Sequence, residues 1–130
     1  MPVREDGPVS YRRYFELSLA RFADDIPAAS IPIERARATV VLVAGGDDAL
    51  WPSEMFAQSL ADRLEATGKH PLLITHPEAG HRVLLPGETT PRSTVNAHGG
   101  NDEADQALGL AAWNAISALL KLPESMPAKS

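Results

Sequence analysis

The sequence predicts an α/β fold built around a parallel strand–helix–strand unit with flanking helices. A continuous, β-branched run at residues 38–44 ends in two glycines and predicts a strand buried on both faces, as is typical of a parallel sheet. An amphipathic segment follows at residues 53–68, and a second short apolar run covers residues 71–76. Short connections between such elements favour two adjacent, parallel strands joined by a helix. With 130 residues, the chain is expected to form one domain or less.

The amino-terminal third is polar and irregular, with one helical segment. Ser10 is a suitable cap for a helix over residues 11–23. The apolar stripe of that helix would carry Tyr14, Phe15, Ser18, Leu19 and Phe22. Pro27 and Pro32 punctuate a linker over residues 28–37. The chain is therefore divided into a lid-like helical segment with linker at 1–30, a main segment at 31–122 and a tail at 123–130.

The helix between the two strands has clear start and stop signals. Ser53 is a good N-cap, and Glu54 is favoured at the positive end of the helix dipole. The inner face of the helix is expected to carry Phe56, Ala57, Leu60, Ala61 and Leu64. Gly68 is expected to end the helix.

A long polar loop at residues 77–100 separates the second strand from a last helix. Loops of this length are usually functional or disordered. Asn101 is expected to cap the helix, with two acidic residues in its first turn and Pro123 after its end. Its buried side is expected to carry Leu108, Ala112, Ala115, Leu119 and Leu122.

The composition is that of an ordinary globular protein and disfavours several function classes. The longest apolar run is far shorter than the roughly 20 residues of a membrane-spanning helix, and no secretory signal is visible. The net charge is −5 and the basic residues are scattered, so no nucleic-acid-binding stripe is present. The chain contains no Cys, and His70, His76 and His98 match no metal motif. We therefore expect no metal, no cofactor, no membrane partner and a cytoplasmic location.

Polar residues follow both predicted strands, at the edge where functional groups gather in open parallel sheets. The first strand is followed by Gly45–Pro52, which contains Asp48, and the second by His76–His81. Taken singly, the Gly-Gly-Asp-Asp run is often only a turn, and a histidine in a loop is often only solvated. Taken together, they predict that the Asp48 carboxylate accepts the His81 Nδ1 proton. Such a bond fixes the tautomer and stabilises the imidazolium of a general base.

Three stretches, in order along the chain, carry a resemblance to one protein family. Residues 31–53 resemble the acid-bearing stretch of the acyl-CoA thioesterase and bile-acid-CoA:amino-acid N-acyltransferase family. Residues 76–81 are similar to that family's histidine loop, and residues 98–107 with Trp113 look like its final helix. The resemblance extends over about residues 31–122. It implies the C-terminal part of an α/β-hydrolase fold of the dienelactone-hydrolase-like type.

The resemblance implies that Asp48 is the acid of a catalytic triad and His81 its general base, since the family order is nucleophile, acid, histidine. Asp48 is preferred to Asp47 because Asp-x-x-Trp-Pro places the second Asp where related hydrolases keep the acid; Asp47 would be a turn residue or a supporting partner. The chain departs from the family in two ways. It has no Cys, and none of its nine serines has glycine at both −2 and +2, so no nucleophile elbow or accompanying oxyanion hole is present. His81 is followed by Arg-Val-Leu-Leu-Pro-Gly, where relatives carry a more aromatic and Pro-rich run.

Two functions are consistent with these features. In the first, the chain is part of a hydrolase or acyltransferase acting on acyl-CoA or ester substrates, inactive until an amino-terminal half supplies the nucleophile. In the second, it is a non-catalytic remnant that forms a homodimer, or binds a partner chain, through an exposed strand edge. A phosphate-binding module is disfavoured because acidic residues directly follow Gly45 and Gly46.

Overall fold

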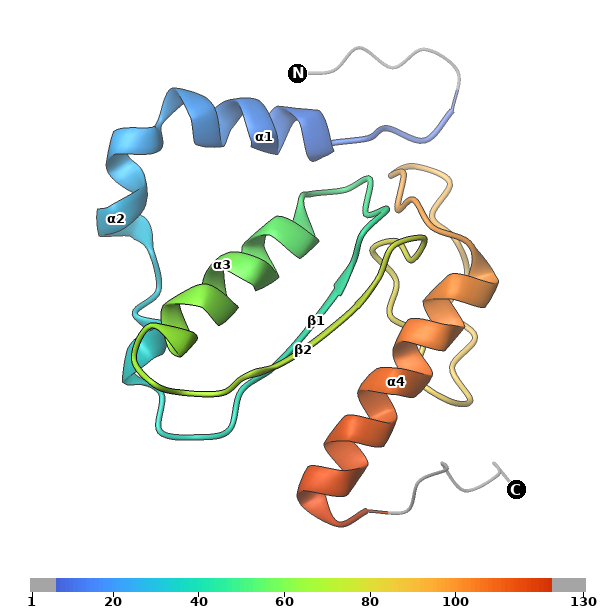
Figure 1. Cartoon of the computed structure of the whole chain (residues 1–130). Helices are drawn as coiled ribbons and strands as arrows, with labels where there is room; N and C mark the ends of the chain where they lie inside the picture. Colours follow the sequence, from blue (N-terminus) through green and yellow to red (C-terminus); the bar gives the residue numbers. More distant parts are fainter. Residues whose placement is uncertain (1–6, 123–130) are drawn as a thin grey trace.

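The computed structural model of the chain describes residues 7–122, which form helices on both sides of a small sheet (Figure 1). Four elements surround the predicted site: β1 (Val41–Gly45), α3 (Ser53–Glu65), β2 (Leu72–His76) and α4 (Asp102–Leu120). They are preceded by α1 (Arg12–Arg21) and α2 (Ile26–Ala29), with 3₁₀ turns at Ala23–Asp25 and Ile33–Arg35. The mixed α/β class expected from the sequence is confirmed. The tail at 123–130, with Pro123, lies outside the described residues.

The two strands pair in parallel, as the sequence predicts. Their register runs from Val41 opposite Leu72 to Gly45 opposite His76. Figure 1 shows the strands between α3 on one side and α4 on the other. The carboxyl ends of β1 and β2 therefore meet at one edge, which is the arrangement that brings the two polar loops together.

The strands are less buried than a central position in a parallel sheet would make them. In β1 only Ala44 and Gly45 are buried, and in β2 the Leu72 side chain is 40% exposed. The expectation that β1 is buried on both faces is therefore wrong. Within residues 7–122 the sheet has two strands, so each strand has a neighbour on one side only.

The core joins the sheet, the histidine loop and α4. Ala79, Ala104 and Leu108 are its buried centre, and Val43, Ile74 and Val83 pack against them. On the other side of the sheet, α3 buries Ala57, Ala61 and Leu64 as expected, while Phe56 and Leu60 are half-buried.

The buried side of α4 is shorter than the sequence predicts. Leu108 and Ala112 are buried, but Leu119 and Leu122 are 45% and 43% exposed. The helix has 19 residues and is about 28 Å long. Strands of 5 residues are only about 17 Å long, so the last turns of α4 run past them. The cap at its other end is confirmed, because the Asn101 side chain accepts a hydrogen bond from the Ala104 N–H at 2.9 Å.

Two expected serine caps are wrong. The first helix starts at Arg12 with Tyr11 in the capping position, while the Ser10 hydroxyl donates to the Ala49 carbonyl at 2.6 Å. Ser53 is itself the first residue of α3, and its hydroxyl caps no helical N–H. Both hydroxyls instead bind groups of the loop that follows β1, which no local signal reveals.

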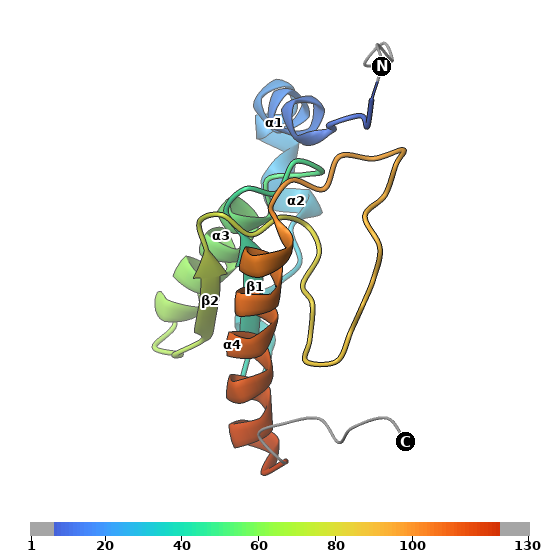
Figure 2. The ribbon, with the colours of Figure 1, turned by 90° about the vertical axis from the view of Figure 1, so that its right-hand side faces the viewer.

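The expected linker at 28–37 is partly helical. Pro27 lies in the first turn of α2, where the missing N–H is not needed for a helical hydrogen bond. Figure 2 shows that the loop at 77–100, in contrast, extends away from the sheet and helices. It contains no helix or strand, and isolated bridges join Asn96 to Val9 and Gly99 to Asp48. No helix within residues 7–122 is long and apolar enough to cross a membrane.

Candidate active site

Asp48 and His81 lie side by side beyond the carboxyl ends of β1 and β2. The Asp48 Oδ2 and His81 Nδ1 atoms are 3.0 Å apart, within hydrogen-bond distance. The Asp48 side chain is 1% exposed, whereas that of His81 is 29% exposed. The structure thus brings together the two residues that the sequence singles out, with the acid buried and the histidine at the surface.

The Asp48 carboxylate is surrounded by donors. Its Oδ1 accepts the backbone N–H groups of Leu50 at 2.8 Å and Trp51 at 3.2 Å. Its Oδ2 accepts the Ser53 hydroxyl at 2.6 Å and faces the His81 Nδ1. A buried carboxylate is costly unless such bonds compensate it. With both oxygens engaged, the carboxylate is fixed in orientation toward the imidazole.

The His81 ring is positioned by its own backbone and by two neighbouring rings. The backbone N–H of His81 donates to the His98 carbonyl at 2.8 Å. The Trp51 ring meets the His81 ring edge-on at 5.2 Å between centroids, and the His98 ring is 5.4 Å away and tilted by 48°. Since Nδ1 faces Asp48, Nε2 is the ring nitrogen left to accept a proton from a reacting group.

The amino-terminal segment holds the acid loop in place. The Arg12 guanidinium donates to the carbonyls of Gly46 and Asp48, each at 3.2 Å. The Ala49 carbonyl accepts both the Ser10 hydroxyl at 2.6 Å and the Arg12 N–H at 3.1 Å. Sequence reasoning missed Ser10 and Arg12 as partners of this loop, because the paired groups are 34 to 39 positions apart.

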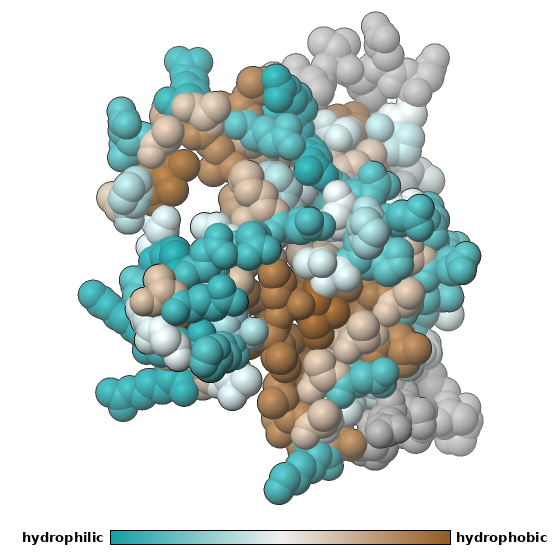
Figure 3. Space-filling model, in the orientation of Figure 1, coloured by the Kyte–Doolittle hydropathy of each residue, from teal (hydrophilic) through white to brown (hydrophobic). Residues whose placement is uncertain are grey.

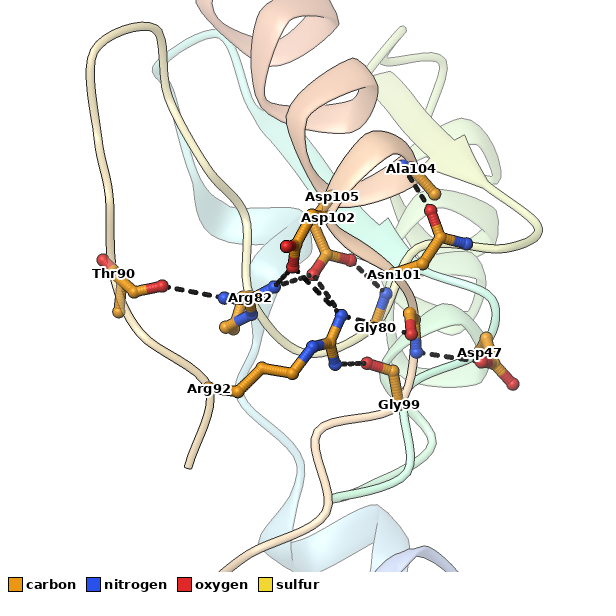
Figure 4. Close-up of polar contacts among 11 residues, drawn as sticks. Asp47, Gly80, Arg82, Thr90, Arg92, Gly99, Asn101, Asp102, Ala104 and Asp105 are labelled. Carbon is orange, nitrogen blue, oxygen red and sulfur yellow. Dashed lines mark hydrogen bonds and ion pairs between the residues drawn. The ribbon is translucent and has the colours of Figure 1, made fainter. Parts of the chain in front are cut away.

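An ionic cluster between α4 and the loop that carries His81 holds that loop in place (Figure 4). The completely buried Asp105 accepts the Gly80 N–H at 2.8 Å and the Arg82 guanidinium at 3.0 Å. Arg82 also donates to Asp102 at 2.5 Å. One carboxylate of α4 thus binds the residues on both sides of His81.

The charges of this cluster shift the pKa values of its members. Burial by itself would lower the pKa of Arg82, but its hydrogen bonds to Asp102 and Asp105 and their charges raise it. The hydrogen bond from Arg82 lowers the pKa of Asp102. Burial, followed by the charges of His81 and Arg82, lowers the pKa of His98. The lowered pKa favours the neutral form of His98, and its Nδ1 is buried without a hydrogen-bond partner within residues 7–122.

Gly99 and Gly100, in the turn before α4, lie against the two loops that carry Asp48 and His81. Both have positive φ, 66° and 68°, and a Cβ on Gly99 would lie 1.8 Å from the Asp47 carbonyl oxygen. The Asp47 carboxylate accepts the Gly100 N–H at 2.9 Å. Asp47 thus fastens the acid loop to this turn, while Asp48 binds the histidine. In the sequence, the glycine pair is the signal of this close approach.

The remaining histidines are not gathered into a site. His70 is exposed, and the His76 Nδ1 accepts the Glu78 N–H at 3.2 Å. Across residues 7–122, no three His, Asp or Glu side chains are grouped so that they could hold a metal ion.

Comparison with known proteins identifies the family of this chain. A family model described as BAAT / Acyl-CoA thioester hydrolase C terminal matches residues 1–121, and the chain belongs to that family. The resemblance seen in the three sequence stretches is thereby confirmed.

Individual relatives carry acyl-CoA thioesterase names. Human acyl-coenzyme A thioesterase 6 is 34% identical over 94 residues, which are 66% of this chain and 22% of that protein. Mouse peroxisomal succinyl-coenzyme A thioesterase is 44% identical over 57 residues, 43% of this chain and 14% of that protein. Human acyl-coenzyme A thioesterase 2, mitochondrial, is 33% identical over 94 residues, 66% of this chain and 20% of that protein. The match therefore spans about a fifth or less of the length of these relatives. Because two of their names refer to peroxisomes and mitochondria, the cytoplasmic location of this chain stays a prediction.

Proposed function

We propose that this chain supplies the acid and the general-base histidine of an acyl-thioester hydrolase site, with the nucleophile coming from another segment. The observation that carries the proposal is the 3.0 Å contact between the His81 Nδ1 and the buried Asp48 Oδ2. Membership of the thioester hydrolase family supports the choice of substrate class. The absence of Cys, and of any serine between two glycines at −2 and +2, is why the nucleophile is sought elsewhere.

The chemistry follows from the two nitrogens of His81. With Nδ1–H held by Asp48, Nε2 takes the proton of a hydroxyl or thiol as that group attacks the thioester carbonyl. The carbon–sulfur bond then breaks, and the imidazolium gives its proton to the departing thiolate. In the second half, Nε2 takes a proton from water as the water attacks the acyl intermediate. The bond between the acyl carbon and the nucleophile then breaks, the imidazolium returns its proton to the nucleophile, and the carboxylic acid is released. An amine in place of water would make the same site an acyltransferase.

Ser53 does not fit the role of nucleophile. Its hydroxyl bonds the same Asp48 oxygen that faces the His81 Nδ1, so it lies on the Nδ1 side of the ring. A nucleophile must instead face Nε2 to lose its proton to this base. The nucleophile is therefore expected on a strand-to-helix elbow brought to the exposed side of His81.

The test is a hydrolysis assay with acyl-CoA and p-nitrophenyl esters. The chain alone should be inactive, and it should become active when an amino-terminal segment of this family, with its nucleophile elbow, is added. His81→Ala should then lower the rate about 10²–10⁴-fold, the usual contribution of a general base. His70→Ala, a change of an exposed histidine outside the site, should leave the rate unchanged.

Two results would contradict the proposal. If the complemented enzyme keeps its rate in His81→Ala, the general base lies elsewhere. If the chain by itself hydrolyses thioesters in a His81-dependent way, the nucleophile lies within it and the divided site is wrong.

A second candidate function, self-association without catalysis, rests on a separate observation. Each strand of the sheet has one neighbour within residues 7–122. Figure 3 shows a band of apolar atoms between α3 and α4, over β2, whose Leu72 is 40% exposed. Unpaired strand edges with apolar side chains favour association with another chain. Sedimentation velocity at micromolar concentration should show a dimer, and a stable, compact monomer would contradict this function.

A further inference from the structure

Ser53 has a contact that neither helix capping nor nucleophilic attack explains. Its hydroxyl oxygen is 2.6 Å from the Asp48 Oδ2 and 3.5 Å from the Gly45 carbonyl oxygen. A hydroxyl has one proton to donate, and the shorter contact to the charged group is much the stronger. The Ser53 proton is therefore directed at the same oxygen to which His81 is bound.

Sharing one oxygen couples Ser53 to the histidine. A donor draws electron density toward itself, so each of the two donors on Oδ2 weakens the attraction of that oxygen for the other. Oδ1 is engaged separately, by the N–H groups of Leu50 and Trp51. Ser53 is thus the side-chain donor that competes with His81 at the oxygen that holds the imidazole.

We propose that Ser53 is a positioning residue that shares the Asp48 Oδ2 with His81 and thereby limits how tightly the carboxylate holds the imidazole proton. The inference rests on the proposed function only in treating Asp48 and His81 as a working pair. A general base must transfer a proton and then release it, so a moderated carboxylate keeps the imidazolium from being held too strongly. Ser53 acts on the reaction through Asp48 and touches no reacting atom.

The experiment follows the His81 Nδ1 proton by NMR in the full chain labelled with ¹⁵N-histidine. In Ser53→Ala, the Oδ2 oxygen keeps a single side-chain donor, so the His81 Nδ1–H resonance should move downfield and exchange more slowly with solvent. Ser53→Thr retains the hydroxyl and should restore the original position. Ser59→Ala, a change of an exposed serine in the same helix, should leave the resonance unmoved.

Asp48→Asn separates the two proposals. If this variant leaves the His81 resonance unchanged, or if the unsubstituted chain shows no Nδ1–H signal, the Asp48–His81 pair itself is wrong. If Asp48→Asn moves the signal but Ser53→Ala leaves it in place or moves it upfield, only the role of Ser53 is wrong. Should Ser53→Ala fail to fold, Ser53→Cys must move the resonance downfield of its position in the unsubstituted chain, because a thiol is a weaker donor than a hydroxyl; the absence of that shift would overturn the inference.

Discussion

Buried charges around the His81 loop are compensated residue by residue. Asp105 is completely buried, yet its oxygens accept the Gly80 N–H and the Arg82 guanidinium. Arg82 is almost as deeply buried and divides its donors between Asp105, Asp102 and the Thr90 carbonyl. Such pairs contribute little net stability but are costly to break, since removal of one partner leaves the other charge buried and unpaired.

Replacement of Asp105 by Ala should therefore destabilise the fold by about 3–5 kcal/mol, which is typical of a broken buried ion pair. Asp105→Asn should cost less, because the amide oxygen can still accept the Gly80 N–H. Urea unfolding followed by circular dichroism measures both variants. Asp24→Ala, a change of an exposed acid, is the control. If the Asp105→Ala midpoint matches that of the control, the ion pair has no structural role.

His98 makes a pH dependence of stability predictable. Its pKa is lowered by burial and by the charges of His81, Arg82 and Arg92, against the opposing effect of Asp48. The unfolded chain, with an ordinary histidine pKa near 6.5, therefore binds the proton at higher pH than the folded chain does. Between the pKa of His98 in the folded chain and its pKa in the unfolded chain, the free energy of unfolding rises with pH. It therefore falls when the pH drops below about 6.5.

His98→Gln should remove this contribution to the slope. We expect the free energy of unfolding of the original chain to fall more steeply between pH 7 and pH 5.5 than that of the variant, both taken from urea titrations in the same buffers. The difference between the two curves isolates His98 from the carboxylates that titrate in both. Parallel curves would show that the protonation of His98 is the same in the folded and unfolded chains.

At the scale of elements, close contact between α4 and the histidine loop depends on a glycine inside the helix. A Cβ on Gly109 would lie 1.7 Å from the Leu84 carbonyl oxygen. The Leu84 N–H in turn donates to the Asp105 carbonyl at 3.3 Å. Gly109 therefore lets the segment after His81 lie directly on α4, at the usual cost of a glycine in a helix.

Gly109→Ala tests this contact. Helix propensity alone favours Ala by about 1 kcal/mol. The clash with Leu84 should outweigh that gain, so we expect net destabilisation within the range of about 1–3 kcal/mol usual for overpacking. Ala111→Gly on the exposed side of α4 should cost about 1 kcal/mol and calibrates the propensity in this helix. The unfolding temperatures of both variants are compared with that of the original chain. A higher unfolding temperature for Gly109→Ala would contradict the close contact between Gly109 and Leu84.

On the scale of the whole molecule, the layers are unequal in extent. Two short strands lie between long helices, and the apolar band over β2 in Figure 3 is open to solvent. Several large apolar side chains of α4 are also exposed, among them Leu110, Leu119 and Leu120. An exposed surface of this kind is typical of a region that another polypeptide covers, whether a second copy or a further part of a hydrolase.

A charge placed on this surface should weaken self-association. Leu72→Lys puts an ammonium group on β2, and charged side chains at strand edges oppose pairing with another chain. We expect the sedimentation coefficient to shift from that of a dimer toward that of a monomer. Met55→Lys is the matched control, since Met55 is 48% exposed but lies at the start of α3. Equal sedimentation of the two variants would place the interface elsewhere.

Local pattern by itself predicted the two strands, the helices α1, α3 and α4, and the strand-end loops that carry Asp48 and His81, but not α2. This was possible because periodicity and turn residues act over a few positions, and because parallel strands must end at one edge. The hydrogen bonds from Ser10, Arg12 and Ser53 to the acid loop, and from Arg82 to Asp105, were decided only by the tertiary structure. A hydroxyl or guanidinium has the same local signature whether it caps a helix, faces water or binds a buried carboxylate. Its partner is fixed only when distant segments pack and exclude water from the groups between them.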